Sequence, residues 1–506
     1  MKHKYRKGVI YLKVSLYHLT VLFLLLLAMA MVINTAIRLN PDNDMWWMMS
    51  TGRYIIENGC VPKINPFTIH EEFHIIVQQW MLAVINYLLY STFGTTGLIV
   101  LAIGIYMAML CLVWKYTAFF TKDNCIRAIA TAAAGIIGGS YLNTRPTLFT
   151  ICVLLLQQIA VLKHKETKNK KWLWFLPALS VLLINLHASL WPFFFVLLLP
   201  HVAPPIWQGK KEFKEQLKEK STCLLPAITA MLAGMLNPNG LKGMLYLFYS
   251  YNSSNLFQVI SELQAPAVAS FSGLFIIATI IGIITYFHQK GENAEAYIVY
   301  MAAGVVILSS MHLRNTWFIL FGLLPLICIL TGQIKQHNII QKLTAQHKST
   351  KKSTKKERAE LILSAIVYSI TLFVIISIFS ISQKEEHSPL PIASADYLDI
   401  NTEKEEVKLY APFNLGGYLQ WRGYKTYMDA RPEIYMARIN GKENIAEEYY
   451  NVFTGTADYE AFIEKYNFTH ILVEKYSFLS MALKGSAQYE CVIEESHFLL
   501  YEKTGQ

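Results

Sequence analysis

The chain opens with MKHKYRKGVIYLKVSLYHLTVLFLLLLAMAMVINTAIR (1–38), a basic start followed by an apolar run without Asp, Glu, Lys or Arg from 15 to 37. A run of about 20 apolar residues can cross a bilayer as a helix. This run is longer than the apolar core of a signal peptide, and no small-residue cleavage site follows it, so we expect it to remain as an anchor. The basic residues before it predict a cytoplasmic N-terminus and place residue 40 outside.

The composition of the 506 residues agrees with this start. Hydrophobic residues make up 54% and charged residues 16%, whereas a soluble domain carries about 25% charged residues. The sequence therefore predicts a polytopic membrane protein and excludes a cytosolic enzyme, a secreted disulfide scaffold and a disordered tail protein. The net charge of +10 comes from short Lys-rich loops, which indicate topology and not binding to nucleic acid.

Further apolar segments of about 17–25 residues are predicted to cross the membrane. They are 97–119, 127–142, 147–163, 172–187, 188–207, 222–236, 269–287, 296–311, 316–333 and 360–382. Together with the first span they give about eleven transmembrane helices in a bundle.

The Lys-rich loops, such as 163–171 and the tract 347–358, should all be cytoplasmic. Alternating crossings satisfy this only if 76–92 does not cross, and its Trp and Tyr residues suit a helix lying in or dipping into the outer leaflet. We therefore expect a transmembrane domain over 1–382, in which 39–95 is a first outer loop with juxtamembrane helices. The segment 383–506 should then be extracytoplasmic. The tract 347–358 is most simply a retention signal for the last span.

The extracytoplasmic segment has a different character. It is richer in polar residues, and its β-like runs alternate with helical stretches at 446–453 and 458–466. The β-like runs are 406–411, 425–428, 470–475, 489–495 and 497–503. Such alternation predicts a small α/β domain. No phosphate loop, metal-ligand spacing or nucleophile elbow occurs in its sequence.

Polar residues that interrupt the apolar pattern fall almost entirely at the span ends that this topology places outside. They are Asp42, Asp44, Asn143, Arg145, Asn185, His187, Asn237, Asn239, Glu262, His312 and Arg314. Ionisable groups at membrane depth are costly and usually face a cavity or a partner. One or two could be snorkelling or capping groups, but the whole set favours one polar chamber at the outer membrane boundary.

The first outer loop, NPDNDMWWMMSTGRYIIENGCVPKINPFT (40–68), is richest in candidate chemistry. It carries Asp42 and Asp44 directly after the first span. A carboxylate held at the membrane interface can act as a general base toward an acceptor hydroxyl. The alternative is that one of them merely caps a helix whose Trp46 and Trp47 form an interfacial belt, and chemistry alone slightly favours it.

The string D-x-W-W-x-x-x-T-G-R-Y-I (44–55), followed by NPFT (65–68) and QWML (79–82), resembles the first outer loop of bacterial GT-C-fold glycosyltransferases. The nearest group is the polyprenyl-phosphate-sugar transferases of the RgtA/B/C/D-like and dolichyl-phosphate-mannose mannosyltransferase-like types. Further short motifs fit the same group: NTRPTLFT (143–150), LLINLHAS (182–189), LNPNG (236–240), SELQAP (261–266), MHLRN (311–315) and FNLGGYLQWRGYKTYMDARPEIY (413–435). The resemblance covers most of the chain.

The resemblance implies an inverting transfer of a sugar from a polyprenyl-phosphate-linked donor, which enters from the lipid bilayer, to a cell-envelope glycan, lipid or protein. It implies that an acidic residue of the first outer loop activates the acceptor. By position Asp44 is the first candidate and Asp42 the second. No cofactor is certain, and a divalent metal is possible but not indicated.

A departing lipid phosphate needs fixed cations or hydrogen-bond donors. Arg145 and Arg314 suit this role because a guanidinium can hold two phosphate oxygens, and His187 and His312 could donate a hydrogen bond or a proton. Trp47, Arg53 and Glu262 complete the candidate substrate-binding set. The structural alternatives are that each Arg positions a loop or pairs with an acid such as Glu262, that each His is an ordinary interfacial residue, and that the Asn residues cap helices.

In the tail, Asp429 and Arg431 predict a turn-stabilising pair, with acceptor binding as the alternative. Trp421, Tyr418 and Tyr424 favour the domain core over sugar stacking.

The sequence departs from the resembling group at Met48, commonly His there, at Asn65, commonly Asp, and at Gln78 and Gln79, where the group has His and Glu. These changes make metal coordination by this loop doubtful. They also leave two other functions open: a non-catalytic GT-C-like assembly subunit, and a transporter or flippase of a lipid-linked precursor. Transporters tend to show inverted repeats and broken helices at the midplane, and we find no such repeat.

Overall fold

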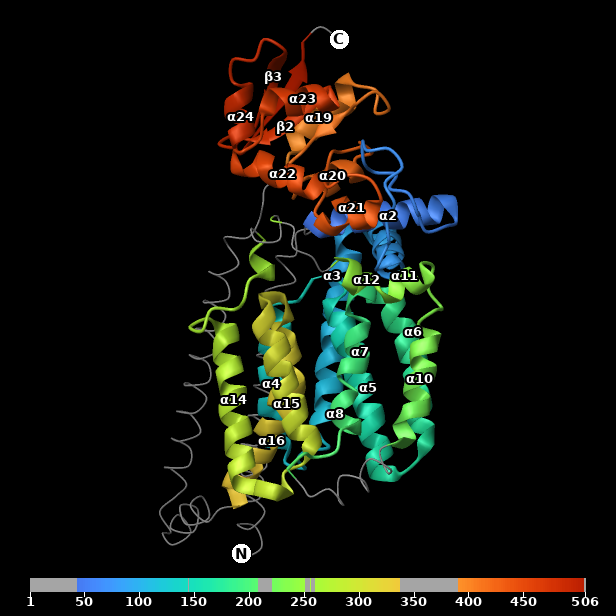
Figure 1. The fold of residues 1–506 in the computed structure, drawn as a ribbon, viewed down its shortest axis with the longest axis vertical. Coiled ribbons are helices and arrows are strands. Elements are labelled where there is room, and N and C mark those ends of the chain that lie inside the picture. Colours follow the sequence, from blue (N-terminus) through green and yellow to red (C-terminus); the bar gives the residue numbers. More distant parts are fainter. Residues whose placement is uncertain are drawn as a thin grey trace, which may run out of the picture.

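The computed structural model describes residues 43–143, 145–207, 221–250, 255, 260–336 and 390–504. The predicted spans 15–37 and 360–382, the basic tract 347–358 and Asp42 lie outside these residues. The described chain forms a tall helical bundle with a smaller mixed domain stacked on one end, and helix α2 (Asn43–Asn58) lies between the two (Figure 1).

The bundle is built from apolar helices. They are α3 (Trp80–Thr117), α4 (Asn124–Gly139), α5 (Thr147–Thr167), α6 (Leu176–His187), α7 (Pro192–Val196), α8 (Leu199–Val202), α10 (Leu224–Ala233), α14 (Phe271–Lys290), α15 (Ala296–Met311) and α16 (Leu320–Gln336). Short elements join them: η1 (Lys170–Phe175), η2 (Ala188–Leu190), η3 (Ser221–Cys223), α11 (Gly240–Met244), α12 (Tyr246–Ser250), η4 (Ser261–Leu263), η5 (Gly291–Asn293) and η6 (Leu313–Ile319).

Five segments of the bundle are long and apolar enough to cross a membrane: Trp80–Thr117, Thr147–Thr167, Lys170–Leu190, Phe271–Asn293 and Leu313–Gly332. Four further predicted spans correspond to shorter apolar helices of 10–17 residues. The multi-pass character is thus confirmed, whereas the count of about eleven spans is not. One reason is that prolines divide the predicted span 188–207 into η2, α7 and α8.

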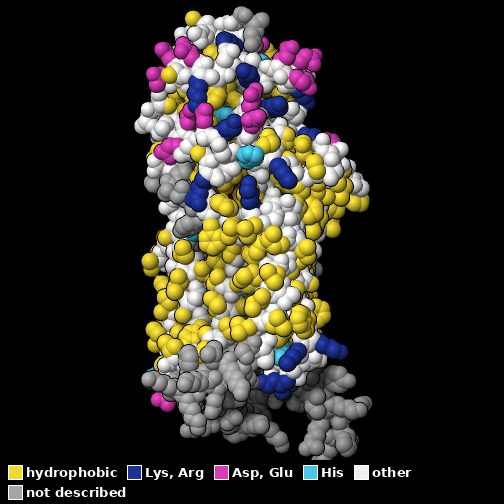
Figure 2. All heavy atoms as spheres, turned by 45° about the vertical axis from the view of Figure 1, so that its right-hand side comes forward, with side chains coloured by type: hydrophobic (Ala, Val, Ile, Leu, Met, Phe, Trp, Pro, Cys, Tyr) yellow, Lys and Arg dark blue, Asp and Glu magenta, His cyan; other side chains and the backbone are white. Residues whose placement is uncertain are grey.

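Hydrophobic side chains cover the middle of the visible face of the molecule, over the bundle (Figure 2). Charged side chains gather over the mixed domain above this band, and a few Lys and Arg side chains lie below it. Such a band between polar ends is the surface that a bilayer requires.

Helix α3 contains a sharp bend that is important for the site. Its 38 residues would span about 57 Å if they were straight, which exceeds the thickness of a bilayer. At Gly94 the backbone leaves the helical region, with φ 60° and ψ −151°, a combination that essentially only glycine adopts. Before the bend, Leu89 and Tyr90 pack with residues of α2 and the mixed domain, and after it Tyr106 and Met109 pack in the bundle core. The non-crossing of 76–92 stays a prediction, since the whole of Trp80–Thr117 is long and apolar enough to cross.

The mixed domain contains a four-stranded sheet in the order β1-β2-β4-β3. Its strands are β1 (Leu409–Tyr410), β2 (His470–Glu474), β3 (Tyr489–Glu494) and β4 (Phe498–Lys503). Its helices are α19 (Ile392–Asn401), α20 (Gly416–Trp421), η9 (Pro432–Tyr435), α21 (Ala437–Asn440), α22 (Ile445–Thr454), α23 (Tyr459–Tyr466) and α24 (Phe478–Leu483). Strand β1 is parallel to β2, and the other pairs are antiparallel. A small α/β sheet with two intervening helices was predicted and is confirmed.

One predicted strand, 425–428, is wrong. Thr426 makes only isolated bridges, to Leu409 of β1 and to Thr68 of the first outer loop. Its amide donates to the carbonyl of Phe67 at 3.1 Å, and its carbonyl accepts from the amide of Ile69 at 3.1 Å. The segment is therefore used to join the outer loop to the sheet edge, and not to extend the sheet.

Candidate active site between helix α2 and the mixed domain

Asp44 lies in the first turn of α2, where the helix dipole favours a negative charge. Both of its carboxylate oxygens are engaged. Trp47 Nε1 donates to Oδ1 at 3.2 Å, and Arg145 Nη1 lies 3.1 Å from Oδ2. The Asp44 side chain is 24% exposed, so it stands at the edge of the interior and not within it.

Arg145 connects Asp44 to a second carboxylate. Its Nη1 also lies 3.3 Å from Oε1 of Glu262, an exposed residue of η4. The loop between α4 and α5 aims this arginine, because the Arg145 amide donates to Oδ1 of Asn143 at 3.0 Å. Three segments far apart in the sequence therefore meet at one guanidinium. The polar chamber expected from the sequence brings at least these three predicted residues together.

His312 holds the loop that carries Glu262. Its Nδ1 lies within hydrogen-bond distance of the carbonyl of Leu263, and the amide of Leu313 donates to the carbonyl of Gln264 at 2.8 Å. Residues 312 and 313 thus contact backbone groups of η4 and of the residue that follows it. This arrangement makes His312 a support for the Glu262 loop.

Arg314 follows directly and presents an exposed guanidinium. Among the described residues it takes part in no ion pair. Its charge acts on Glu433 and Tyr246, so these groups are its electrostatic neighbours. Tyr246 Oη donates to Oε1 of Glu433 at 2.8 Å. Burial raises the pKa of the Glu433 carboxyl, opposed by the Tyr246 hydrogen bond and by the charges of Arg431 and Arg314.

His187 ends α6 and is buried. Its Nδ1 lies 2.8 Å from Oγ1 of Thr150, and the charge of Arg314 reaches it as well. His187 therefore borders the same region as Arg314, with one ring nitrogen already engaged by a hydroxyl.

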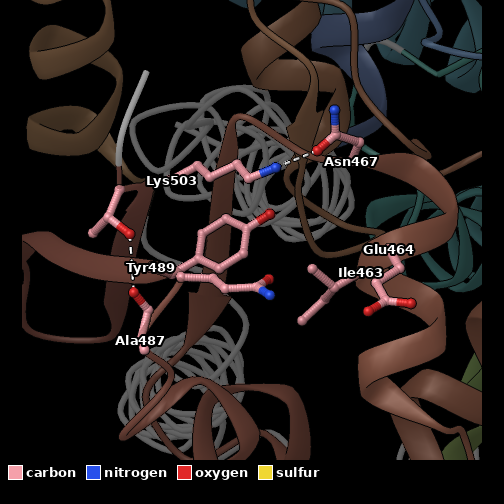
Figure 3. A pocket seen from close by; sticks show the side chains of 8 residues that line it. Ile463, Glu464, Asn467, Ala487, Tyr489 and Lys503 are labelled. Atoms are coloured by element: carbon pink, nitrogen blue, oxygen red, sulfur yellow. Dashed lines mark hydrogen bonds between the residues drawn. The ribbon is translucent and has the colours of Figure 1, made fainter.

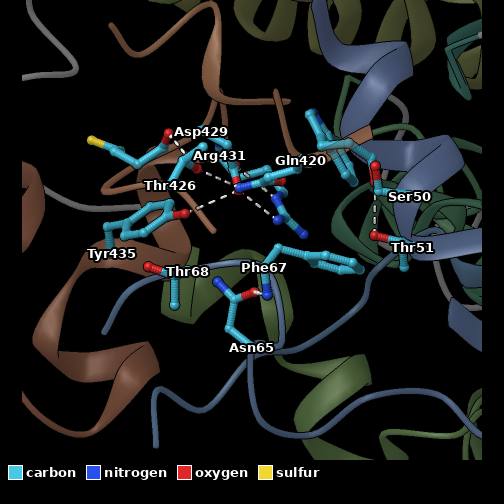
Figure 4. Close-up of polar contacts among 12 residues, drawn as sticks. Ser50, Thr51, Asn65, Phe67, Thr68, Gln420, Thr426, Asp429, Arg431 and Tyr435 are labelled. Carbon is cyan, nitrogen blue, oxygen red and sulfur yellow. Dashed lines mark hydrogen bonds and ion pairs between the residues drawn. The ribbon is translucent and has the colours of Figure 1, made fainter. Parts of the chain in front are cut away.

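Trp47 is 5% exposed and is contacted by a polar cluster of the mixed domain, whose Gln420, Asp429, Arg431 and Tyr435 lie close together (Figure 4). The Arg431 guanidinium lies over its ring, 4.6 Å from the centroid. Asp429 in turn fixes Arg431 with Oδ1···Nε at 2.8 Å and Oδ2···Nη2 at 2.6 Å. Gln420 Nε2 and Tyr435 Oη donate to the same carboxylate at 2.9 and 3.0 Å. The predicted turn-stabilising pair of Asp429 and Arg431 is confirmed. Arg431 packs on Trp47 of α2.

Arg53 points away from this group. Its guanidinium lies 4.6 Å from the ring centroid of Trp421, and its Nη2 donates to the carbonyl of Trp421 at 3.1 Å. Trp421 packs against Trp46, Tyr87 and Tyr90. Its role in packing was predicted and is confirmed, and Arg53 belongs to the same packed seam.

Three asparagines of the predicted chamber satisfy the backbone, as expected. Asn185 Nδ2 donates to the carbonyls of Val181 and Leu236, at 2.8 and 2.9 Å. Asn237 Nδ2 donates to those of Gly234 and Gly240. Asn239 Nδ2 donates to that of Val77 at 3.2 Å. These contacts tie together the chain segments at the end of the bundle that faces the mixed domain.

The positions that depart from the resembling group are structural. Met48 is 1% exposed and packs in the bundle core. Asn65 is buried and its Oδ1 accepts from the amide of Phe67 at 3.1 Å, while Gln79 precedes α3 and is buried. In the part of the chain that the structure describes, no group of three or more His, Cys, Asp or Glu side chains could hold a metal ion.

Sequence reasoning did not single out Tyr246, Glu433, Gln420 or Tyr435 as partners of this region. Glu433, Gln420 and Tyr435 stand in the quoted stretch 413–435. The signal that could have found them is the gathering of polar side chains around Asp429 in that stretch. Tyr246 offers no such signal, because an aromatic residue after a span is ordinary in a membrane protein.

A pocket of about 390 Å³ lies elsewhere, in the mixed domain between α23 and the edge of the sheet (Figure 3). Its lining includes Glu464, Asn467, Tyr489 and Lys503. Lys503 Nζ donates to Oδ1 of Asn467. None of the predicted site residues lines it, so it is a notch separate from the Asp44 region.

The described residues form a multi-pass helical bundle with a mixed domain at one end, and charged groups converge where the two meet. Among solved structures, the chain is similar to the archaeal oligosaccharyltransferase AglB from Archaeoglobus fulgidus, in complex with an inhibitory peptide and a dolichol-phosphate. The TM-score is 0.58 at 10% identity, over 95% of this chain and 74% of that chain. This likeness confirms the predicted fold and carries no information on the finer subgroup. No protein-family model and no curated protein matches the sequence.

Proposed function

We propose that this protein is an inverting membrane glycosyltransferase. It would move a sugar from a polyprenyl-phosphate-linked donor to a cell-envelope glycan, lipid or protein on the outer face of the cytoplasmic membrane, with the N-terminus in the cytoplasm. Asp44 is the proposed general base. The observation that carries the proposal is the meeting of Asp44, Arg145 and Glu262 at the junction of the bundle and the mixed domain, in a fold similar to that of a solved oligosaccharyltransferase.

In the proposed reaction the oxygen of an acceptor hydroxyl bonds to the anomeric carbon as the bond from that carbon to a phosphate oxygen breaks. The acceptor proton passes to Asp44, and the electron pair leaves with the lipid phosphate. Arg314 stabilises the departing negative charge, since it is exposed and is not ion-paired with any described residue. Trp47 and His187 border this reaction space.

Arg145 gives the resting site a way to respond to the donor. It now divides its charge between Asp44 and Glu262. An arriving phosphate competes for the same guanidinium, which can hold two phosphate oxygens at once. Movement of Arg145 toward the phosphate would release Oδ2 of Asp44 for the acceptor proton, so that the base becomes available only when a donor is bound.

The test is transfer by the purified protein and its Asp44→Asn variant. Polyprenyl-phosphate-linked hexoses and pentoses are supplied with cell-envelope extract, and products are scored by mass. We expect Asp44→Asn to abolish transfer while the protein stays folded and in the membrane. The matched control is Asp396→Asn, because Asp396 also pairs with an arginine, Arg422, at 2.7 Å. Full activity in both Asp44→Asn and Asp42→Asn would refute the mechanism.

A second candidate is a non-catalytic GT-C-like assembly subunit. It is favoured by one observation: both oxygens of Asp44 are already engaged by protein groups. A subunit of this kind would give no product with any donor in the panel, yet its deletion would reduce envelope glycan in cells, and Asp44→Asn would restore that glycan. A flippase would also give no product, but it would move the lipid-linked sugar across proteoliposomes.

A further inference from the structure

We infer that Trp47 is a positioning residue for the base and that Arg431 of the mixed domain holds it, so that the mixed domain is part of the active site. The inference rests on the proposed function, in which Asp44 takes the acceptor proton. It goes beyond that function by assigning the mixed domain a role in positioning the base, whereas the sequence predicted a turn-stabilising pair there, with acceptor binding as the alternative.

The indole of Trp47 has one polar atom, and that atom faces Asp44. Nε1–H donates to Oδ1 at 3.2 Å, while Trp47 is only 5% exposed. A tryptophan with a buried ring and a directed N–H is a rigid donor with few rotatable bonds. The direction of this bond is thus set by whatever holds the ring.

The mixed domain contacts Trp47 at its backbone and at its ring. Gly417 of α20 faces the start of α2 so closely that a Cβ on it would lie 3.2 Å from the Trp47 amide nitrogen and 3.3 Å from its Cβ. The Arg431 guanidinium covers the ring face at 4.6 Å from the centroid. The Gly417 contact fixes where the side chain leaves α2, and the Arg431 cation packs on the ring, so the mixed domain restricts the direction of the indole N–H.

Arg431 is itself fixed. Three of its nitrogen atoms, counting the backbone amide, donate to Asp429, which has no exposure to solvent. A cation over the face of an indole is attracted by the ring electrons, and more strongly when it is desolvated. It also draws electron density from the ring and so strengthens the N–H as a donor. The chain of contacts from Asp429 through Arg431 and Trp47 to Asp44 therefore acts on the base from the mixed domain.

The experiment is a double-mutant cycle on the full-length purified protein. It uses Trp47→Phe, which keeps the aromatic ring and removes the N–H, together with Arg431→Gln and the double variant. The substrate is whichever polyprenyl-phosphate-linked hexose or pentose gives product with the unaltered protein. We expect each single variant to lower kcat by about tenfold or more with the KM for the donor within about twofold, because an interaction made only at the reacting centre is lost.

The double variant should be no slower than the worse single variant, because the two residues act on Asp44 through the same series of contacts. The matched control is Arg422→Gln, which removes an arginine that donates to Asp396 and Asp399 within the mixed domain. It should lower the thermal midpoint without changing kcat. If Arg431→Gln does not fold, Trp47→Phe and Arg431→Lys carry the test, and the lysine variant should recover only part of kcat.

Two outcomes overturn the inference: multiplicative losses in the double variant, or an unchanged kcat in Trp47→Phe. If these occur while Asp44→Asn is inactive, the proposed function stands and only the positioning role fails. If Asp44→Asn and Asp42→Asn are both fully active, the proposed mechanism fails first, and the role of Trp47 falls with it.

Discussion

At the residue scale, Asp429 makes more hydrogen bonds than the single pair with Arg431 that the sequence predicted. Its carboxylate accepts from the side chains of Arg431, Gln420 and Tyr435 and from a backbone amide. It has no exposure to solvent. A buried pair of this kind gives little net stability over apolar residues, but breaking it leaves an uncompensated charge.

Asp429→Asn should therefore be strongly destabilising. The neutral amide leaves Arg431 buried without its counter-ion, and we expect a loss of about 3–5 kcal/mol in the free energy of unfolding. Thermal unfolding in detergent measures it. Asp396→Asn breaks a pair whose carboxylate is 55% exposed, and such a pair contributes about 1 kcal/mol or less. Equal effects of the two substitutions would contradict the buried-pair account.

His70 gives the molecule an acid-sensitive point in the first outer loop. Its Nε2 lies 2.9 Å from the carbonyl of Tyr427, and its ring stacks on Phe73 with centroids 4.7 Å apart. Burial lowers the pKa of His70 from 6.5 to about 4. The folded protein therefore binds fewer protons here than the unfolded chain at pH values between about 4 and 6.5.

The stability due to His70 is complete above pH 6.5 and is lost as the pH falls toward 4. The shift corresponds to about 3 kcal/mol across that window. Thermal midpoints of the unaltered protein and of His70→Phe, compared from pH 7 to 4, should converge as the pH falls. His497→Gln, which changes an exposed imidazole, serves as the control and should leave the pH dependence unchanged. Parallel curves for the unaltered protein and His70→Phe would refute the assignment.

At the element scale, the bend of α3 at Gly94 depends on a conformation that a side chain rarely adopts. Gly94→Ala places a Cβ on a backbone with φ 60°, which costs on the order of 1–3 kcal/mol. We expect a lower thermal midpoint and faster proteolysis near residue 94, because an alanine there disfavours the backbone conformation that the bend requires.

Gly104→Ala is the matched control. Gly104 lies in the same helix, and a Cβ on it would meet nothing within 4 Å. Because alanine favours helix over glycine by about 1 kcal/mol, this substitution should be neutral or stabilising. If both substitutions stabilise the protein, the bend does not require glycine.

The helices and strands could be predicted where the local sequence pattern was strong. Long uncharged stretches gave α5, α14 and α15 near their observed bounds, and alternation gave β2 and β4. The segment 425–428 has the same β-like composition, but the backbone of its Thr426 forms hydrogen bonds with Phe67 and Ile69, which are far away in the sequence. Pairing of that kind depends on tertiary contact, so local pattern cannot reveal it.

The site was predictable only in part for a similar reason. The sequence predicted that Asp44, Arg145 and Glu262 lie on one face, since charge parity put their span ends on one side. It could not tell that Arg53 turns toward Trp421 while Arg431 turns toward Trp47. Side-chain direction at such a seam is set by the packing of two domains and not by either segment alone.

At the scale of the whole molecule, the proposed chemistry requires α2 and the mixed domain on the same side of the membrane. Cys60 and Cys491 are exposed and unpaired, so they are natural reporters of sidedness. Variants that retain one of the two as their only cysteine should each react with a membrane-impermeant maleimide in intact cells. Labelling is scored as a mass shift after purification.

The control is a cysteine at Thr167, in the Lys-rich loop 163–171, in an otherwise cysteine-free chain. That loop is expected on the cytoplasmic side, so the variant should react only after the cells are permeabilised. If Cys60 and Cys491 label on opposite sides, the reaction space assembled from both domains could not exist.

The strand order of the mixed domain determines when its sheet can be completed during biosynthesis. Strand β4 follows every other described element along the chain, yet it lies inside the sheet, paired with both β2 and β3. Until 498–503 has left the ribosome, the sheet lacks the strand that joins β2 to β3. The domain that packs on α2 can therefore complete its sheet only after the bundle helices have been synthesised. In the reaction proposed above, a nascent chain would transfer no sugar before β4 has joined the sheet.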